Sequence, residues 1–191
     1  MSTMSDPAGD DYTEHTLDSK TVYRGIMLHV LDDKVRLPDG STSRREYVRH
    51  PGAVMVLAFA DDRTLVLERQ YRYAIGQHLI ELPAGKLEAG EDPLEAAQRE
   101  LREECGYTAA SWRHLNTVHP CVGYADERIE FYLARDLKQV GRSLDEGEFL
   151  EVLHVPVADA VSWIAQGRIT DVKALMGILW AEKLVRGDWP R

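Results

Sequence analysis

The apolar and polar positions divide the chain into an N-terminal block of short strands and a longer region of mixed character. In the first block, apolar segments typical of strands occur at residues 22–30, 34–37 and 44–49. Between the last two lies Pro38-Asp39-Gly40, in which Asp-Gly supplies the positive φ angles of a tight turn. This block, residues 14–50, is too small to hold a core of its own. We therefore expect it to pack on the rest of the chain or on a partner chain.

The region after His50 begins with two strands of different character. Ala53–Phe59 is an unbroken apolar run, typical of a strand that is buried on both faces. In the next strand, Leu65 and Leu67 face one side. Val66 and Glu68 face the other side, because side chains alternate along a strand. Strands are predicted over 64–71, 79–82, 112–119, 129–134 and 149–155.

One helix has clear signals at both ends. Asp92 is a good N-cap, Pro93 suits the first helical position, and Gly106 is the expected residue after the helix. The sequence therefore predicts a helix over Pro93–Cys105. Its apolar positions, which we expect to face the core, are Leu94, Ala97, Leu101 and Cys105.

Two more helices are predicted near the C-terminus. The first covers Val157–Gln166 and ends at Gly167, and the second begins near Asp171 and ends before Gly187. The apolar side of the second helix is formed by Leu175, Ile178, Leu179 and Leu184. Strands and helices are mixed without a strict βαβ rhythm. This order favours an α/β fold in which a mixed sheet lies between helices.

Composition and charge exclude several classes of protein. Hydrophobic residues make up 44% of the 191 residues, which is enough for a buried core. The longest apolar run is far shorter than the roughly 20 residues of a membrane-spanning helix. The formal net charge of −9 argues against a nucleic-acid-binding protein. The polar residues 1–13 predict a disordered tail without a secretory signal, and two cysteines fit the reducing cytoplasm.

Three carboxylates share one face of the predicted helix. At about 100° per residue, Glu100 and Glu104 are about 40° apart, and Glu103 lies about 60° to the other side of Glu100. A cluster of hard oxygen ligands is what Mg²⁺ or Mn²⁺ prefers. Arg99 is positioned to hold Glu103 by a charge-assisted hydrogen bond. The alternative is an acidic helix face that only meets solvent.

The wider spacing decides between these alternatives. Gly85 is followed after five residues by Glu91, and after seven more by Arg99-Glu100-Leu101-x-Glu103-Glu104-x-Gly106-Tyr107. This pattern resembles the Nudix box at every fixed position. Outside the box, the chain resembles the ADP-ribose pyrophosphatase branch of that family. The stretches that carry this second resemblance are 45–46, 50–54, 68–72, 81–85 and 119–120.

The resemblance implies a fold and an activity. The fold is a Nudix α/β/α sandwich with a mixed β-sheet, formed here by residues 51–191 and preceded by the small N-terminal β block. The activity is divalent-metal-dependent hydrolysis, with Mg²⁺ or Mn²⁺, of the pyrophosphate bond of ADP-ribose. Alternatives are GDP-mannose or another nucleotide sugar as substrate, or a catalytically silent sensor of a nucleotide metabolite. The branch commonly forms homodimers through the N-terminal block.

The resemblance also implies site residues. Metal ligands fall on the carbonyl of Ala84 and on Glu100 and Glu104, with Glu103 as a further ligand. The glutamate that positions or deprotonates the attacking water falls on the loop 121–127, where Glu127 is our choice. Glu130 is the competitor, although it lies within a predicted strand.

Substrate contacts are the remaining expectation. Arg69 is predicted to clamp a phosphate, and its alternative is a salt bridge with Glu68 or Glu81. In this branch, residues of the opening β block hold the base and the ribose, which points to Arg45 and Tyr23. Gly85 is also expected to contact the substrate.

Overall fold

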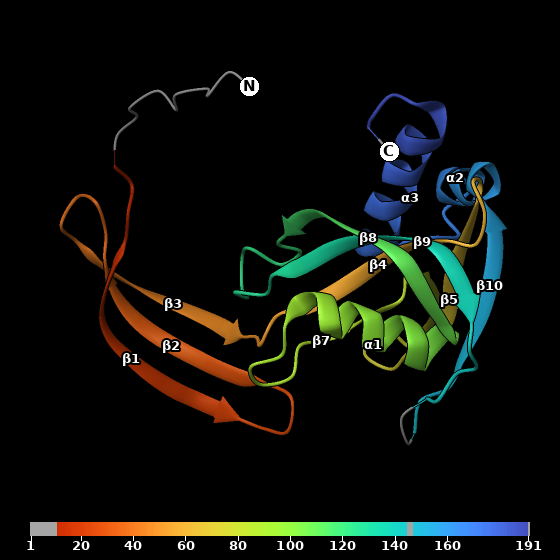
Figure 1. Ribbon diagram of the computed structural model, residues 1–191. Helices are drawn as coiled ribbons and strands as arrows, with labels where there is room; N and C mark the ends of the chain where they lie inside the picture. Colours follow the sequence, from red (N-terminus) through yellow and green to blue (C-terminus); the bar gives the residue numbers. More distant parts are fainter. Residues whose placement is uncertain (1–10, 145–146, 191) are drawn as a thin grey trace. The chain divides into compact units, whose positions relative to one another are not determined.

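The computed structural model describes residues 11–144 and 147–190, so residues 1–10 of the predicted tail lie outside the described residues. The chain forms two compact units. The N-terminal unit contains the described residues up to His50 together with Cys121–Asp126. The second unit, here termed the catalytic unit after the predicted activity, contains Pro51–Pro120 and the described residues from Glu127 onward. Figure 1 shows the ribbon of both units, which are described separately below.

The N-terminal unit is a three-stranded antiparallel sheet in the order β1-β2-β3. Its strands are β1 (His15–Arg24), β2 (His29–Arg36) and β3 (Thr42–Arg49). The single strand predicted over 22–30 is wrong, because the chain turns there and the Gly25 N–H donates to the Leu28 carbonyl at 2.8 Å. The apolar run continues through this turn with exposed side chains. Hydrophobicity alone therefore does not reveal the turn.

A distant loop completes the N-terminal unit. Residues Cys121–Asp126 lie against the end of β3, where the Val48 N–H donates to the Tyr124 carbonyl at 2.8 Å. The Asp126 N–H donates back to the Val48 carbonyl at 3.2 Å, and the Asp126 carboxylate accepts from the His50 N–H at 2.7 Å. The loop predicted to carry the catalytic base is thus divided. Its first six residues belong to the N-terminal unit, and Glu127 belongs to the catalytic unit.

The catalytic unit is built on a mixed sheet, as the sequence predicts. Its strands in the described residues are β4 (Ala53–Phe59), β5 (Thr64–Arg72), β6 (Gln77–Glu81), β7 (Ala84–Lys86), β8 (Tyr107–Val118), β9 (Ile129–Gln139) and β10 (Leu150–Pro156). The main order is β10-β5-β4-β9-β8, with β6 beside β5 and β7 beside β4. Strands β4 and β9 run parallel, and the other pairs are antiparallel.

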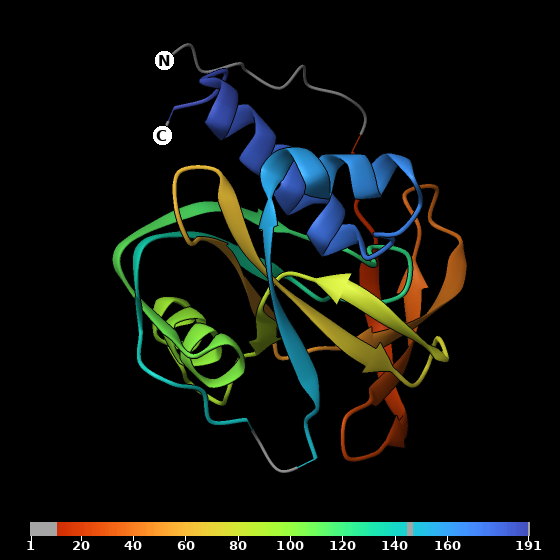
Figure 2. The same cartoon turned by 90° about the vertical axis from the view of Figure 1, so that its right-hand side faces the viewer.

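Helices cover both faces of this sheet, which confirms the predicted α/β/α sandwich. Helix α1 (Pro93–Cys105) lies on one face, and α2 (Val157–Ala165) and α3 (Val172–Arg186) lie on the other (Figures 1 and 2). The ends of α1 are confirmed as well. The Asp92 side chain accepts from the Leu94 N–H at 2.9 Å, and Gly106 takes the left-handed conformation with φ 76°.

Strand β4 contributes side chains to the hydrophobic cores on both faces of the sheet. All seven of its residues are buried. Met55, Leu57 and Phe59 pack with α2 and α3, while the alternate residues Val54 and Val56 pack with α1. The unbroken apolar run thus predicts its structure correctly, because both faces of this strand are covered.

Strand β5 continues the same division. Leu65 and Leu67 join the core that contains α2 and α3, and Val66 joins the core that contains α1. Glu68 follows on the α1 side and is fully buried. The predicted alternation is therefore confirmed, and it places a carboxylate inside the sandwich.

The predicted core faces of two helices need correction. In α1 the buried residues include Ala96, Glu100 and Glu104, whereas Leu94 is only half-buried. In α3, Leu179 is exposed. The buried face of α1 is wider than its apolar positions predict, because the side chains of Glu100 and Glu104 are also turned inward. That inward turn brings the carboxylates to the sheet.

Candidate active site

Helix α1 turns two of the three predicted carboxylates toward the sheet. Glu100 and Glu104 are buried, with 9% and 5% of their surface exposed, and Glu103 is half-buried at the edge. Glu100 and Glu104 lie one turn apart, so both leave the helix on nearly the same side. Each carboxylate therefore meets the backbone of the short strand β7.

The β7 backbone approaches these carboxylates very closely. The Ala84 N–H donates to Glu104 Oε2 at 3.1 Å, which fixes one oxygen of that side chain. At Gly85, a Cβ atom would overlap the carboxylate of Glu100. Only glycine leaves room here. Gly85 is thus in contact with the predicted cation site, and the Ala84 residue next to it lies where the sequence places a carbonyl ligand.

Arg99 holds the outer carboxylates in place. Its guanidinium donates to both oxygens of Glu91, at 2.8 and 3.1 Å. The same group donates to Glu100 at 2.8 Å and to Glu103 at 3.2 Å. These bonds, with that to Glu91 as the largest cause, raise the pKa of Arg99 further above its ordinary value. Arg99 therefore orients three carboxylates at once, which is more than the single contact with Glu103 that the sequence predicts.

A second row of acidic side chains comes from the sheet. Glu68 of β5 and Glu81 of β6 are opposite each other in the strand pairing, with exposures of 0% and 1%. Glu81 accepts from Arg72 Nε at 2.7 Å and Nη2 at 2.9 Å, and Lys173 Nζ lies 3.3 Å from it. Glu68 has no hydrogen-bond partner among the described residues. Sequence periodicity places Glu68 on this face but does not reveal the neighbours.

Burial and mutual repulsion make these carboxylates hard to ionise without a cation. Desolvation, followed by the charges of Glu68 and Glu100, raises the pKa of Glu104. Desolvation likewise raises the pKa of Glu100, despite the opposing charge of Arg99. Burial and the neighbouring Glu81 raise the pKa of Glu68. The electrostatic environment is therefore one that a bound cation would stabilise.

The donor set fits a hard divalent cation. Across residues 11–144 and 147–190, no group of three His, Cys, Asp or Glu side chains is arranged so as to hold a metal ion by itself. Two buried carboxylates and the adjacent Ala84 carbonyl are nonetheless oxygen donors of the kind that Mg²⁺ uses. Magnesium keeps several waters and takes further oxygens from substrate phosphates, so a complete cage of protein ligands is not needed.

The two candidates for the catalytic base differ in their surroundings. Glu127 is half-buried and precedes β9. Glu130 lies within β9, and its carboxylate accepts from Thr117 Oγ1 at 2.7 Å and contacts His114 Nε2 at 2.8 Å. Although burial opposes ionisation, these contacts hold the pKa of Glu130 below its ordinary value. A carboxylate engaged in this way is a weaker proton acceptor.

Arg69 is not beside the acidic cluster. It follows Glu68 on β5 and therefore points to the opposite face of the sheet, where it lies 3.7 Å from Glu151 of β10. Among the described contacts, Arg69 pairs with neither Glu68 nor Glu81, and Arg72 is the arginine that holds Glu81. Arg69 and Arg72 are three residues apart on β5, so their side chains point to opposite faces of the sheet. The phosphate contact of Arg69 stays a prediction.

The predicted base and ribose contacts lie in the N-terminal unit. Tyr23 of β1 is exposed. Arg45 of β3 pairs with Glu14 and donates to Ser43 Oγ at 3.1 Å. Both residues are therefore on the surface of their own unit, and their substrate contacts stay a prediction.

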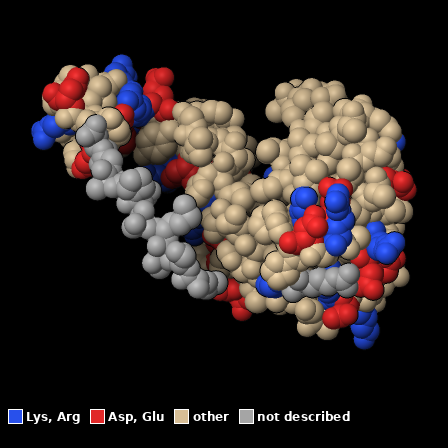
Figure 3. Space-filling model, turned by 90° about the horizontal axis from the view of Figure 1, so that it is seen from above, with Lys and Arg blue, Asp and Glu red and all other residues tan. Residues whose placement is uncertain are grey.

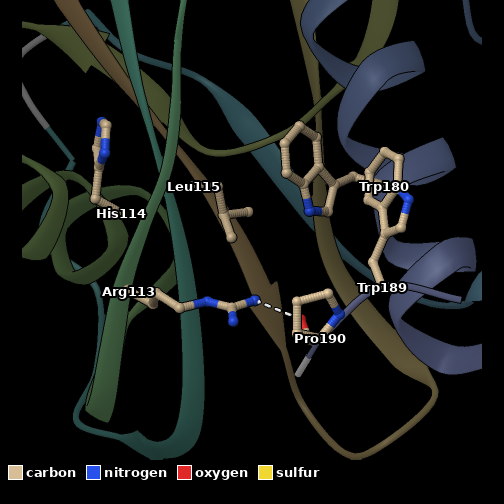
Figure 4. A pocket seen from close by; sticks show the side chains of 6 residues that line it. All are labelled: Arg113, His114, Leu115, Trp180, Trp189 and Pro190. Carbon is tan, nitrogen blue, oxygen red and sulfur yellow. Dashed lines mark hydrogen bonds between the residues drawn. The ribbon is translucent and has the colours of Figure 1, made fainter. Parts of the chain in front are cut away.

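A cavity of about 270 Å³ lies on the side of the catalytic unit away from α1. Figure 4 shows Trp180 and Trp189 facing Leu115 and Arg113 across it, with Arg113 donating to the Pro190 carbonyl at 3.0 Å. His114 points away from this group in the same view. The cavity contains none of the predicted carboxylates, so we do not assign the hydrolytic chemistry to it.

Two further features concern nucleic acids and membranes as partners, namely the surface charge and the character of the helices. Figure 3 shows acidic and basic side chains side by side over part of the catalytic unit, while much of the rest of that face carries neither. Among the described helices, none combines the length and the apolar character needed to cross a bilayer.

Known proteins are similar to this chain over most of its length. Residues 48–175 match the NUDIX domain, and residues 14–48 match the nucleoside diphosphate sugar hydrolase N-terminal domain. The chain is 38% identical over 176 residues to the methanol dehydrogenase activator of Bacillus methanolicus, covering 91% of this chain and 95% of that protein. It is 37% identical over 171 residues to the ADP-ribose pyrophosphatase of Bacillus subtilis (strain 168), covering 88% and 92%.

A solved structure supports the fold. The structure described as an ADP compounds hydrolase aligns with a TM-score of 0.82 and 24% identity, covering 92% of this chain and 95% of that chain. The NUDIX match covers strands β4 to β10, helix α1 and the carboxylates described above. Together with relatives more than 30% identical over most of their length, it shows that this chain belongs to the Nudix hydrolase family.

Proposed function

We propose that this protein hydrolyses the pyrophosphate bond of ADP-ribose, giving AMP and ribose 5-phosphate. The observation that carries this proposal is the pair Glu100 and Glu104, buried against the backbone of Ala84 and Gly85. The relative from Bacillus subtilis named as an ADP-ribose pyrophosphatase supports the choice of substrate. Nudix hydrolases generally require a divalent metal, and we propose Mg²⁺, with Mn²⁺ as a substitute.

The proposed ligands of the cation come from α1 and β7. Glu100, Glu104 and the carbonyl of Ala84 would ligate it, with Glu103 at the half-buried edge as a further ligand. When bound, a divalent cation neutralises the charge that develops on pyrophosphate oxygens and lowers the pKa of a coordinated water. Arg99 keeps Glu100 and Glu103 oriented, so that little reorganisation is needed during the reaction.

We propose Arg72, rather than Arg69, as the arginine nearest to the reacting phosphates. Its guanidinium is on the acidic side of the sheet and is partly exposed while it holds Glu81. Planar guanidinium groups bind phosphate oxygens as a fork. Glu81, which Lys173 also holds, would position Arg72 for that contact.

The base assignment predicts different effects for two glutamates. We expect Glu127→Gln to lower kcat by about a hundredfold to ten-thousandfold, because an amide does not accept the proton of the attacking water. Glu130→Gln should lower kcat far less, since its carboxylate is already bound by Thr117 and His114. Steady-state kinetics at saturating ADP-ribose measures both effects. A larger loss in Glu130→Gln would reverse the assignment.

A substrate panel tests the proposed function. ADP-ribose, GDP-mannose, NADH and diadenosine polyphosphates are each incubated with the protein, with Mg²⁺ or with a chelator. We expect metal-dependent release of AMP, with ADP-ribose preferred by at least about tenfold, or about 1.4 kcal/mol in the barrier. Preference for GDP-mannose would keep the mechanism and change the substrate. Tight binding of ADP-ribose without any hydrolysis would instead favour the sensor alternative.

We also propose that the protein is a cytoplasmic homodimer. Exposed apolar side chains gather on β1 and on the turn to β2, namely Leu17, Val22, Tyr23, Ile26, Met27 and Leu28. Such a group of side chains is typical of a surface that another chain covers. Cys105 and Cys121 are free thiols, which fits a reducing compartment.

A further inference from the structure

Glu68 is a buried carboxylate outside the Nudix box. Its side chain is fully buried, and neither of its oxygens has a hydrogen-bond partner among the described residues. An ionised carboxylate in such a place is strongly unfavourable unless a positive charge or several donors compensate it. The presence of Glu68 at this position therefore needs a physical reason.

The strand geometry directs Glu68 toward the carboxylates of α1. It lies on the same side of β5 as Val66, which belongs to the same buried cluster as Ala97, Leu101 and Cys105 of α1. Its charge contributes to the raised pKa of Glu104 and, after desolvation, is the largest cause of the raised pKa of the Cys105 thiol. Glu68 is thus buried on the face of β5 that shares a core with α1, the helix that carries Glu100 and Glu104.

The neighbouring Glu81 shows what is missing at Glu68. Both glutamates are buried side by side on paired strands. Glu81 is held by the guanidinium of Arg72 and the ammonium of Lys173, and these contacts hold its pKa below the ordinary value although burial opposes this. Burial and the charge of Glu81 oppose the ionisation of Glu68, and Glu100 and Glu148 oppose it further, whereas Arg72 favours it without donating a hydrogen bond to it. Glu81 is therefore held by direct contacts with two cationic side chains, whereas Glu68 has no hydrogen bond to Arg72 or to any other described residue.

We propose that Glu68 is an additional ligand of the divalent cation held by Glu100 and Glu104, and that it reaches this cation from β5. This inference rests on the cation requirement of the proposed function. The cation would then lie between the helix and the sheet, with carboxylates on two walls. A hard cation accepts three carboxylates, a backbone carbonyl and the remaining waters or phosphate oxygens as ligands. Because the described side chains do not already form such a set of three, binding of the cation would have to draw Glu68, Glu100 and Glu104 together.

The competing interpretation predicts a different change in cation affinity when Glu68 is replaced. If Glu68 were only a protonated structural residue, or a neighbour that repels Glu104, its removal would leave the affinity for cations unchanged or increase it. If Glu68 is a ligand, its removal must weaken the affinity. The direction of the change separates the two.

Binding of Mn²⁺ without substrate provides a readout that does not depend on turnover. Free Mn²⁺ is measured by electron paramagnetic resonance during titration of the full chain. We expect Glu68→Gln, which keeps the size of the side chain, to weaken Mn²⁺ binding by about tenfold or more. Glu95→Gln removes an exposed charge from the first turn of the same helix and should leave the affinity unchanged. Glu68→Met, an apolar side chain of similar length, should give the same loss and serves if the first variant does not fold.

The outcomes distinguish this inference from the proposed function. Wild-type binding that Glu104→Gln weakens but both Glu68 variants retain would overturn the inference and leave the cation site intact. Absence of Mn²⁺ binding by the wild type would overturn the cation site and the inference with it. Weakening by both Glu68 variants, with no change in Glu95→Gln, would support the inference.

Discussion

The Glu104→Gln variant is expected to lose at least about a thousandfold in kcat while keeping its fold. Glu104 is buried and fixed by the Ala84 N–H, so its charge points into the proposed cation site. A metal ion supplies several kcal/mol of transition-state stabilisation, and a thousandfold corresponds to about 4 kcal/mol. An amide of the same size still accepts the Ala84 hydrogen bond but offers the cation no charge. Initial rates with ADP-ribose at saturating Mg²⁺ measure the loss.

Thermal unfolding provides the control for this variant. Without metal, Glu104→Gln should unfold at the same temperature as the wild type or higher, because it removes a desolvated carboxyl group that other carboxylates repel. The exposed Glu95→Gln variant should keep both turnover and stability. Turnover of Glu104→Gln close to the wild-type value would overturn its assignment as a ligand.

Gly85→Ala should lower kcat by about a hundredfold. The added methyl group would overlap the Glu100 carboxylate, which must then move away from β7. A displacement of roughly 1 Å in a catalytic arrangement has effects of this size. The rates of Gly85→Ala, Glu100→Gln and the double variant are compared at saturating substrate, with circular dichroism as a check on the fold.

The double variant separates two roles of Gly85. If the glycine acts by leaving room for Glu100, the losses overlap, and the double variant is no worse than Glu100→Gln alone. Fully additive losses would contradict this explanation. They would instead favour the expectation that Gly85 contacts the substrate directly.

Local signals in the sequence were sufficient for the parts of the fold that depend on neighbouring residues. Asp92, Pro93 and Gly106 determine the ends of α1 because capping involves backbone groups within one turn of the helix. The apolar run of β4 identifies a strand covered on both faces. The spacing of Glu100 and Glu104 places both carboxylates on one side of α1, whatever packs against it.

Other features depend on contacts between residues far apart in the sequence, which no local pattern predicts. The turn between β1 and β2 lies inside an apolar run, so hydrophobicity could not locate it. Glu81 is held by Arg72 and not by Arg69, because the two arginines are an odd number of residues apart on β5 and so lie on opposite faces of the sheet. The binding of Cys121–Asp126 to β3 joins segments more than 70 residues apart.

The sequence by itself thus determined the family, the fold class and the acidic residues of α1, because each depends on spacing along the chain. Only the tertiary structure decided that Glu68 and Glu81 lie opposite each other on paired strands, and that among the described contacts Arg72 and Lys173 bind Glu81 directly and leave Glu68 without a hydrogen bond. The physical reason is that burial and charge compensation depend on which strands and helices meet. These contacts are made between residues that no local pattern connects.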